Sequence, residues 1–418
     1  MIQNLSALFV ASFLVNLANA AITTLIGILV ANEGGTQGEV SLIATAYAAG
    51  FAIGCLATPG QASRIGVIRT YAMAAALATI TIVGMDIGHS TTSWAVLRFV
   101  MGASIAAVLA VSDSWISSTA RDGTLGRVIA VYSIVLGFAS VVSQLVFLWL
   151  GDDADQLTLF FAILMNLSVV VLVGSGVPQP PAPEASPKLL VFSMPSLTAG
   201  TAAFVSGFCV AVITSVMPFS LSVYDVPVDR IAAAVLFLYL GRLIFQWPIG
   251  LLSDRLDPRL LIALLTIPLI VFCIFDILYG PSEGRRLSGE EGQLMLVVTL
   301  TMALLIGAMI FPMYSVSSTL AFSRAEPGSV IRVSTTLLII YSLGSILGPA
   351  SIAALSPLVG DYAFSISTLA VNVLLLLIAA FRLHQRTPPE EPSSTLPVPG
   401  TSLDMIQAAG EIAEEAAS

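Results

Sequence analysis

Charged residues are scarce in this chain, and chemically versatile ones are scarcer. Asp, Glu, Lys and Arg make up only 10% of its 418 residues, whereas a soluble domain carries about 25%. Histidine occurs twice, cysteine three times and lysine once, at Lys188. We therefore expect no histidine-based catalytic relay, no metal centre and no cofactor. Because Lys188 follows a proline, no phosphate-binding Gly-Lys-Ser/Thr is present, and an ATP-driven pump is excluded.

Apolar residues account for most of the sequence. Hydrophobic types make up 57% of the chain, and its mean hydropathy is +0.96. Twelve apolar runs are each long enough to cross a hydrocarbon core of about 30 Å. They lie at 5–30, 39–59, 70–88, 93–117, 128–150, 156–177, 197–220, 230–252, 259–280, 293–318, 328–355 and 361–382. Because the runs are continuous rather than alternating, they predict an all-α integral membrane protein with twelve transmembrane helices.

The short connections between these runs exclude a soluble catalytic domain, so we expect no enzyme. The net charge is −9, and its acids gather in loops and in the tail, which offers no surface for nucleic acid. The partners that remain are the lipid bilayer and a small-molecule solute. No feature of the sequence indicates an oligomer, so we expect a monomer.

A proline-rich stretch between the sixth and seventh runs divides the chain, because consecutive prolines lack the N–H that a helix needs. The predicted parts are a six-helix half at 1–177, a linker at 178–196, a second six-helix half at 197–383 and an acidic tail at 384–418. We expect the tail to be disordered because it is acidic and lacks aromatic residues. A partner-binding helix over 402–418 is the alternative.

Basic residues are distributed unevenly between the two sides of the predicted bundle. Eleven of the sixteen lie in the connections that follow even-numbered runs and in the tail, and three lie on the opposite side. Cytoplasmic loops retain Lys and Arg. We therefore expect both termini in the cytoplasm and a location in the inner (plasma) membrane of a bacterial-type cell.

The eighth run ends in a motif that carries a family resemblance. Residues 241–256 read Gly-Arg-Leu-Ile-Phe-Gln-Trp-Pro-Ile-Gly-Leu-Leu-Ser-Asp-Arg-Leu. Gly250, Asp254 and Arg255, followed by Arg259, resemble the Gly-x-x-x-Asp-Arg element of the major facilitator superfamily (MFS). The resemblance implies two six-helix halves that rock about a midplane site, with these residues as a charged gate on the cytoplasmic side. Asp257 stands where the family has a glycine.

The matching place in the first half carries a weaker copy of the motif. Arg64, Gly66 and Arg69 fit it, while Ser63 replaces the acid of the family. By resemblance, Asp113 is the fourth-helix acid that contacts this basic loop. A carboxylate there could also titrate during transport. Recurrence of one pattern in both halves is itself an internal repeat, as expected for MFS carriers.

Two further elements resemble the superfamily. Arg98 and Gly102 match an arginine followed four residues later by glycine, and Gly344, Gly348 and Pro349 match a Gly-x-x-x-Gly-Pro element that we assign to helix packing. The fifth run lacks this Gly-Pro element, so the antiporter form is absent. The chain is most similar to small bacterial permeases of unassigned substrate.

Polar residues inside the spans are the candidate binding residues, because an ionised group in the bilayer core costs at least ~2.5–3.5 kcal/mol. Arg98 is predicted either to line the cavity or to anchor its helix. Tyr239, Arg242 and Gln246 share one helix face, and Arg242 is the leading candidate for binding or coupling. Asn16 and Asn19, with Thr23, form another polar face, as cavity lining or as links between helices. Further lining candidates are Tyr132, Gln144 and Tyr341.

Two arginines and few acids within the spans favour a polar or anionic solute, with protons as the expected coupling ion. Two alternatives stay open. One is a proton-coupled exporter of hydrophobic drugs, and the other is a carrier-like sensor or lipid-handling protein that transports no soluble solute.

Overall fold

The computed structural model describes residues 2–88, 90–119, 125–151, 153–176, 196–253, 255–279, 292–325 and 330–385. Asp254 lies outside the described residues. So does the predicted linker except for Ser196, and the predicted tail except for His384 and Gln385.

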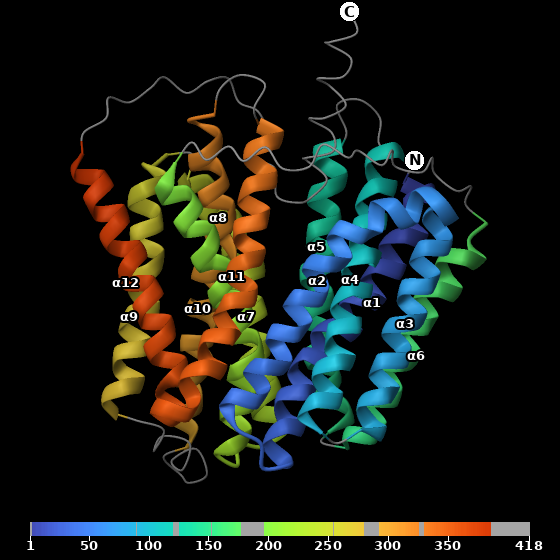
Figure 1. The fold of residues 1–418 in the computed structure, drawn as a ribbon, viewed down its shortest axis with the longest axis horizontal. Helices are drawn as coiled ribbons and strands as arrows, with labels where there is room; N and C mark the ends of the chain where they lie inside the picture. The colour runs from blue at the N-terminus through green and yellow to red at the C-terminus, as the bar shows by residue number, and fades with distance from the viewer. Residues whose placement is uncertain are drawn as a thin grey trace, which may run out of the picture. The chain divides into compact units, whose positions relative to one another are not determined.

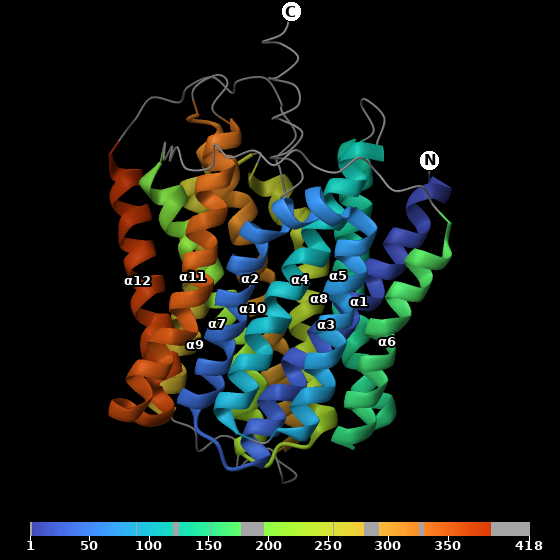
Figure 2. The same ribbon diagram turned by 45° about the vertical axis from the view of Figure 1, so that its right-hand side comes forward.

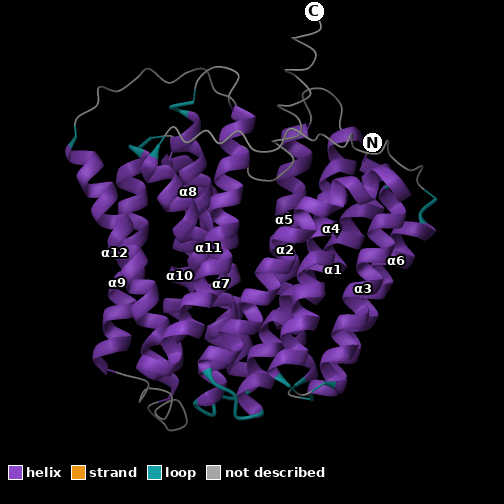
Figure 3. Cartoon of the chain, in the orientation of Figure 1, coloured by secondary structure: helices purple, strands orange, loops and turns teal. Residues whose placement is uncertain are grey.

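The described residues form twelve α-helices, which correspond to the twelve apolar runs (Figures 1 and 3). They are α1 (Ile2–Asn32), α2 (Gln37–Ile65), α3 (Val67–Ile87), α4 (Thr91–Thr119), α5 (Leu125–Leu150), α6 (Ala154–Gly174), α7 (Leu197–Val223), α8 (Val228–Ser253), α9 (Pro258–Tyr279), α10 (Gly292–Phe322), α11 (Val330–Val359) and α12 (Ala363–His384). A short 3₁₀ turn, η2 (Gly360–Tyr362), joins α11 to α12.

Most of these helices are long and apolar enough to cross a membrane. Within the described residues ten candidate spans meet that standard, and one of them, Val333–His384, contains both α11 and α12. Eleven of the twelve helices are thus included, and the exception is α8, which carries Arg242 and Gln246. The predicted all-α membrane fold is confirmed.

The chain forms two compact units. The first comprises Met1–Leu189 with Thr214–Val223 and Pro227–Leu236, and the second comprises the remainder. In the first unit, α4 packs against α2 and α3, while α6 packs against α1 and α3. In the second, α9 packs against α10 and α12, and Figures 1 and 2 show α9 beside α12 in both views. The predicted boundaries between the halves stay a prediction.

Local chemistry sets the ends of α2. Thr36 caps its start: the Thr36 side chain accepts a hydrogen bond from the Glu39 N–H, and the Glu39 carboxylate accepts one from the Thr36 N–H at 2.7 Å. Its end is fixed by Gly66, whose φ of 91° favours glycine because a Cβ strains that conformation. Gly66, predicted as part of the gate, is therefore the turn residue between α2 and α3.

Glycines bring α2 and α4 into direct backbone contact. A Cβ atom at Gly50 would overlap the carbonyl oxygen of Phe99, and one at Gly102 would overlap the carbonyl oxygen of Tyr47. Phe99 lies three residues before Gly102, and Tyr47 lies three residues before Gly50, so the contact is reciprocal. Such small residues permit close approach in a bilayer, where packing rather than hydrophobic exclusion holds helices together.

The same reciprocal arrangement recurs twice in the second unit. Gly241 and Gly307 form it between α8 and α10, and Gly207 and Gly344 form it between α7 and α11. The pair α8–α10 lies six helices after α2–α4, as an internal repeat of six helices predicts. Gly348 also lies close to the backbone of α7, and Pro349 is buried beside it.

Candidate functional site

A buried arginine holds three helices of the first unit together. Arg98 on α4 is only 2% exposed, and its Nη2 donates to Thr23 Oγ1 on α1 at 3.2 Å. Its guanidinium carbon lies 4.2 Å from the ring centroid of Tyr47 on α2. The Tyr47 hydroxyl donates to Asn19 Oδ1 at 3.0 Å. Asn19, Thr23, Tyr47 and Arg98 are called the Arg98 cluster below.

The charge of Arg98 is compensated only in part. Within the described residues no carboxylate lies within ion-pair distance of it, and its buried Nε has no hydrogen-bond partner. A cation over an aromatic face gains ~0.5–2 kcal/mol, whereas a buried donor left without a partner costs about 1–3 kcal/mol. The Arg98 cluster therefore retains one strong donor that is not satisfied in this conformation.

A second arginine lies among aromatic rings in the second unit. The guanidinium carbon of Arg242 on α8 lies 5.1 Å from the ring centroid of Phe311 on α10. The Tyr239 ring lies 6.1 Å from the same ring, and Tyr341 on α11 packs edge-on against Tyr314 at 5.1 Å. The Tyr239 and Tyr341 hydroxyls are within electrostatic range of the Arg242 guanidinium. Together these five residues are called the Arg242 cluster.

The two clusters share one design and differ in access. In each, a guanidinium lies over an aromatic ring, a tyrosine hydroxyl is near, and the described residues place no carboxylate within ion-pair distance of the arginine. Arg98 is enclosed by protein, while Arg242 is half-exposed. Guanidinium groups and aromatic faces of this kind are suited to anions and π-rich groups, and Arg242 is the less buried of the two arginines.

Comparison with known proteins identifies the fold family. The family model for the Major Facilitator Superfamily matches residues 8–349. The chain belongs to the Major Facilitator Superfamily. It is accordingly a multi-pass membrane protein and a secondary transporter rather than an enzyme.

Its curated relatives are bacterial and distant. An uncharacterized MFS-type transporter of Enterobacter sp. (strain 638) is 24% identical over 370 residues, covering 87% of this chain and 92% of the relative. YcaD of Escherichia coli O9:H4 (strain HS), also uncharacterized, is 24% identical over 369 residues with the same coverage.

Solved MFS structures share the fold at low identity. The nucleoside transporter NupG has a TM-score of 0.70 at 14% identity and covers 93% of this chain and 100% of its own. A D-xylose–proton symporter has a TM-score of 0.65 at 17% identity and covers 90% of this chain and 96% of its own. At these identities the likeness extends to the fold alone.

Not every predicted binding residue joins a cluster. Asn16 donates to the Leu136 carbonyl oxygen at 2.6 Å and to Ser140 Oγ at 3.0 Å, so it links α1 to α5. Gln246, predicted on the face of Tyr239 and Arg242, has an exposed side chain. The structure thus brings Asn19 together with Arg98, and Tyr239 together with Arg242.

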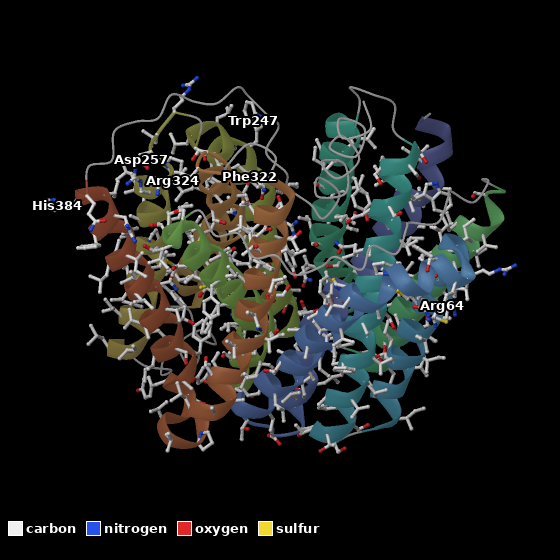
Figure 4. All side chains as sticks on the ribbon, turned by 45° about the horizontal axis from the view of Figure 1, so that its top comes forward. Arg64, Trp247, Asp257, Phe322, Arg324 and His384 are labelled. Carbon is white, nitrogen blue, oxygen red and sulfur yellow. The ribbon has the colours of Figure 1, made fainter. Side chains whose placement is uncertain are left out.

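The first-half MFS motif presents its arginines to the surface. Arg64 and Arg69 are exposed, and Figure 4 labels Arg64. Asp113, by contrast, is only 5% exposed and is within electrostatic range of Cys55 and Tyr132. The predicted contact between Asp113 and this loop stays a prediction.

In the second-half motif, an unexpected residue holds an arginine. Arg259 Nε pairs with Asp257 Oδ1 at 3.3 Å, and Arg259 Nη1 donates to the Arg382 carbonyl oxygen at 2.9 Å. Asp257, the departure from the family pattern and labelled in Figure 4, therefore orients Arg259. Arg255 is exposed. A Cβ at Gly250 would meet nothing within 4 Å among the described residues, so the space beside this position is open in this conformation.

The sequence alone did not reveal the aromatic partners of the two arginines. Tyr47, Phe311 and Tyr314 carry no motif, and tyrosine in a span is more often a packing residue. One signal was present for two of the cluster tyrosines: Tyr47 and Tyr341 each lie three residues before a glycine of a helix crossing.

Proposed function

We propose that this MFS transporter carries a small polar or anionic solute by alternating access, and that Arg242 contacts the solute. The observation that carries the proposal is the state of Arg242: a permanent cation within the helical bundle, half-buried, with no carboxylate partner among the described residues. A charge in such surroundings is expensive and marks a functional site by default.

Arg98 is the second candidate contact. Because it is enclosed by α1, α2 and α4, it can reach a solute only after these helices move. Its unsatisfied Nε then becomes available as a donor to an anion. Each unit thus holds a buried or half-buried arginine without a carboxylate partner among the described residues, and a positive charge favours an anion over a cation.

Proton coupling is proposed through Asp113, the only carboxylate that is buried among the described residues. The proposal also places both termini in the cytoplasm and Asp254, Arg255 and Arg259 at the cytoplasmic gate. Asp113→Asn should abolish uptake driven by a proton gradient while retaining exchange of solute for solute. Equal loss of both activities would instead mean that Asp113 is structural.

The test of the anion site is ligand-dependent thermal stability of the purified protein, because a ligand at 100 times its Kd stabilises by ~2.7 kcal/mol. Small acids, sugars, amino acids and lipophilic cations are compared on wild type, on Arg242→Leu and on Arg382→Leu. Arg382, at the cytoplasmic end of α12 by the predicted orientation, is the matched control.

Stabilisation by anions should be retained in Arg382→Leu and lost in Arg242→Leu. If lipophilic cations stabilise all three proteins equally, the proposed anion carrier is wrong and an exporter of hydrophobic drugs is favoured instead. Ligand binding without flux in proteoliposomes would indicate a sensor or lipid-handling protein.

A further inference from the structure

The Arg242 cluster has more aromatic surface than the binding of a simple anion requires. Phe311 lies against the guanidinium, Tyr239 packs against Phe311, and Tyr314 and Tyr341 form a second pair at an interplanar angle of 72°. Arg242, Phe311, Tyr314 and Tyr341 are all half-exposed. Four rings from three helices thus gather around one cation.

The aromatic rings fall into two groups with different tasks. Phe311 covers a face of the guanidinium, which leaves the N–H donors at the edge of the plane for a ligand. Those donors form a rigid fork that matches a carboxylate in two parallel hydrogen bonds. Phe311 is therefore a positioning residue, because it holds the plane of the fork without needing to touch the ligand.

Tyr341 and Tyr314 form the second group of rings. The Tyr341 hydroxyl is within electrostatic range of Arg242, and its ring meets Tyr314 edge-on. An edge-to-face pair offers a further flat ring both an edge and a face to pack against, with centroids 4.5–7 Å apart. A ligand with a carboxylate on the fork therefore has aromatic surface available for its body.

We propose that the solute is an aromatic carboxylate, whose carboxylate binds Arg242 and whose ring packs on Tyr341 and Tyr314. This inference rests on the proposed function and narrows its solute class. An uncharged sugar would leave the Arg242 charge uncompensated. An aliphatic acid would satisfy the charge but gain no ring-to-ring contact.

Two probes of equal charge and similar size separate these cases. Benzoate and cyclohexanecarboxylate both carry one carboxylate, and they differ in the flat π face. Their affinities for the purified full-length protein are measured by titration calorimetry in detergent. Benzoate should bind at least about 2-fold more tightly, since one aromatic pair contributes roughly a 2- to 10-fold preference.

Three variants assign the preference to its residues. Arg242→Leu should abolish binding of both probes, and Phe311→Leu should weaken both equally because it loosens the fork. Tyr341→Leu should bring the two affinities together by weakening benzoate alone. Phe381→Leu, which removes an exposed ring of α12 outside the cluster, should leave both affinities unchanged.

The possible results test separately whether the solute is aromatic and whether the protein binds anions through Arg242. If both acids bind equally and both depend on Arg242, or if only aliphatic anions bind, the aromatic inference fails and the anion carrier stands. If no anion binds, or if binding survives Arg242→Leu, both fail. Melting temperatures of the variants without ligand show whether each has folded.

Discussion

The crossing of α2 and α4 predicts opposite effects for one substitution at two positions of the same helix. Gly50 and Gly60 both lie within α2. A Cβ at Gly50 would overlap the Phe99 carbonyl oxygen, whereas one at Gly60 would meet nothing within 4 Å. Gly50→Ala must push α4 away, because a backbone oxygen in a helix cannot turn aside as a side chain can.

The expected magnitudes follow from the two environments. Alanine in place of glycine gains ~0.8–1.0 kcal/mol of helix propensity at either position. At Gly60 this gain has no steric cost, so the free energy of unfolding should rise or stay unchanged. At Gly50, overpacking costs about 1–3 kcal/mol, and the net effect is a destabilisation of as much as ~2 kcal/mol.

A double mutant tests the mechanism as well as the sign. Gly102 faces α2 at the same crossing, so Gly102→Ala alone should also destabilise. Once Gly50→Ala has separated the helices, adding Gly102→Ala should cost less than it does alone, since neighbouring sites are not additive. Melting temperatures in detergent of the wild type, the two single mutants, the double mutant and Gly60→Ala measure this. A Gly50→Ala protein that melts as high as Gly60→Ala, or single-mutant costs that add in the double mutant, would refute a steric contact at this crossing.

Three further predictions each concern a single residue. Asn16→Leu should lower the free energy of unfolding by about 1 kcal/mol, because two interhelical hydrogen bonds of ~0.6 kcal/mol are lost; an unchanged melting temperature would contradict this. Tyr47→Phe keeps its ring over Arg98 and should lower the melting temperature less than Tyr47→Leu, which also removes a cation–π contact of ~0.5–2 kcal/mol; equal effects would rule out that contact. Burial, with the charges of Asp361 and Asp276, raises the pKa of Tyr224 from 10.0 to about 12. The folded state then holds its proton longer than the unfolded state, so stability should fall as pH rises between these two pKa values, and Tyr224→Phe should remove that part of the fall; an identical pH profile would refute it.

The fold was predictable from sequence because the bilayer leaves few choices. Continuous apolar runs must form helices, and the motif at 250–255 together with its weaker copy at 64–69 identified the superfamily. Arg98 and Arg242 were found for a related reason: a charge inside a span is conspicuous in any sequence.

The partners of those arginines could not be predicted in the same way. Which ring lies over a guanidinium depends on the rotation and separation of packed helices, and apolar runs do not encode these. Tyr47 and Phe311 became visible only through the crossings at Gly50 and Gly307, which fix how α2 meets α4 and how α8 meets α10. Similarly, spacing alone did not separate Asn16, which links α1 to α5, from Asn19, which reaches the Tyr47 hydroxyl.

Counterflow in proteoliposomes tests the central claim most directly. Vesicles loaded with unlabelled benzenesulfonate or methanesulfonate, which stay ionised and cross lipid slowly, are diluted into the labelled anion. We predict transient accumulation of label by vesicles with the wild type or Arg382→Leu. Vesicles with Arg242→Leu should accumulate no more label than vesicles without protein. Wild-type vesicles that accumulate neither anion, or Arg242→Leu vesicles that accumulate as much as the wild type, would contradict an anion carrier that works through Arg242.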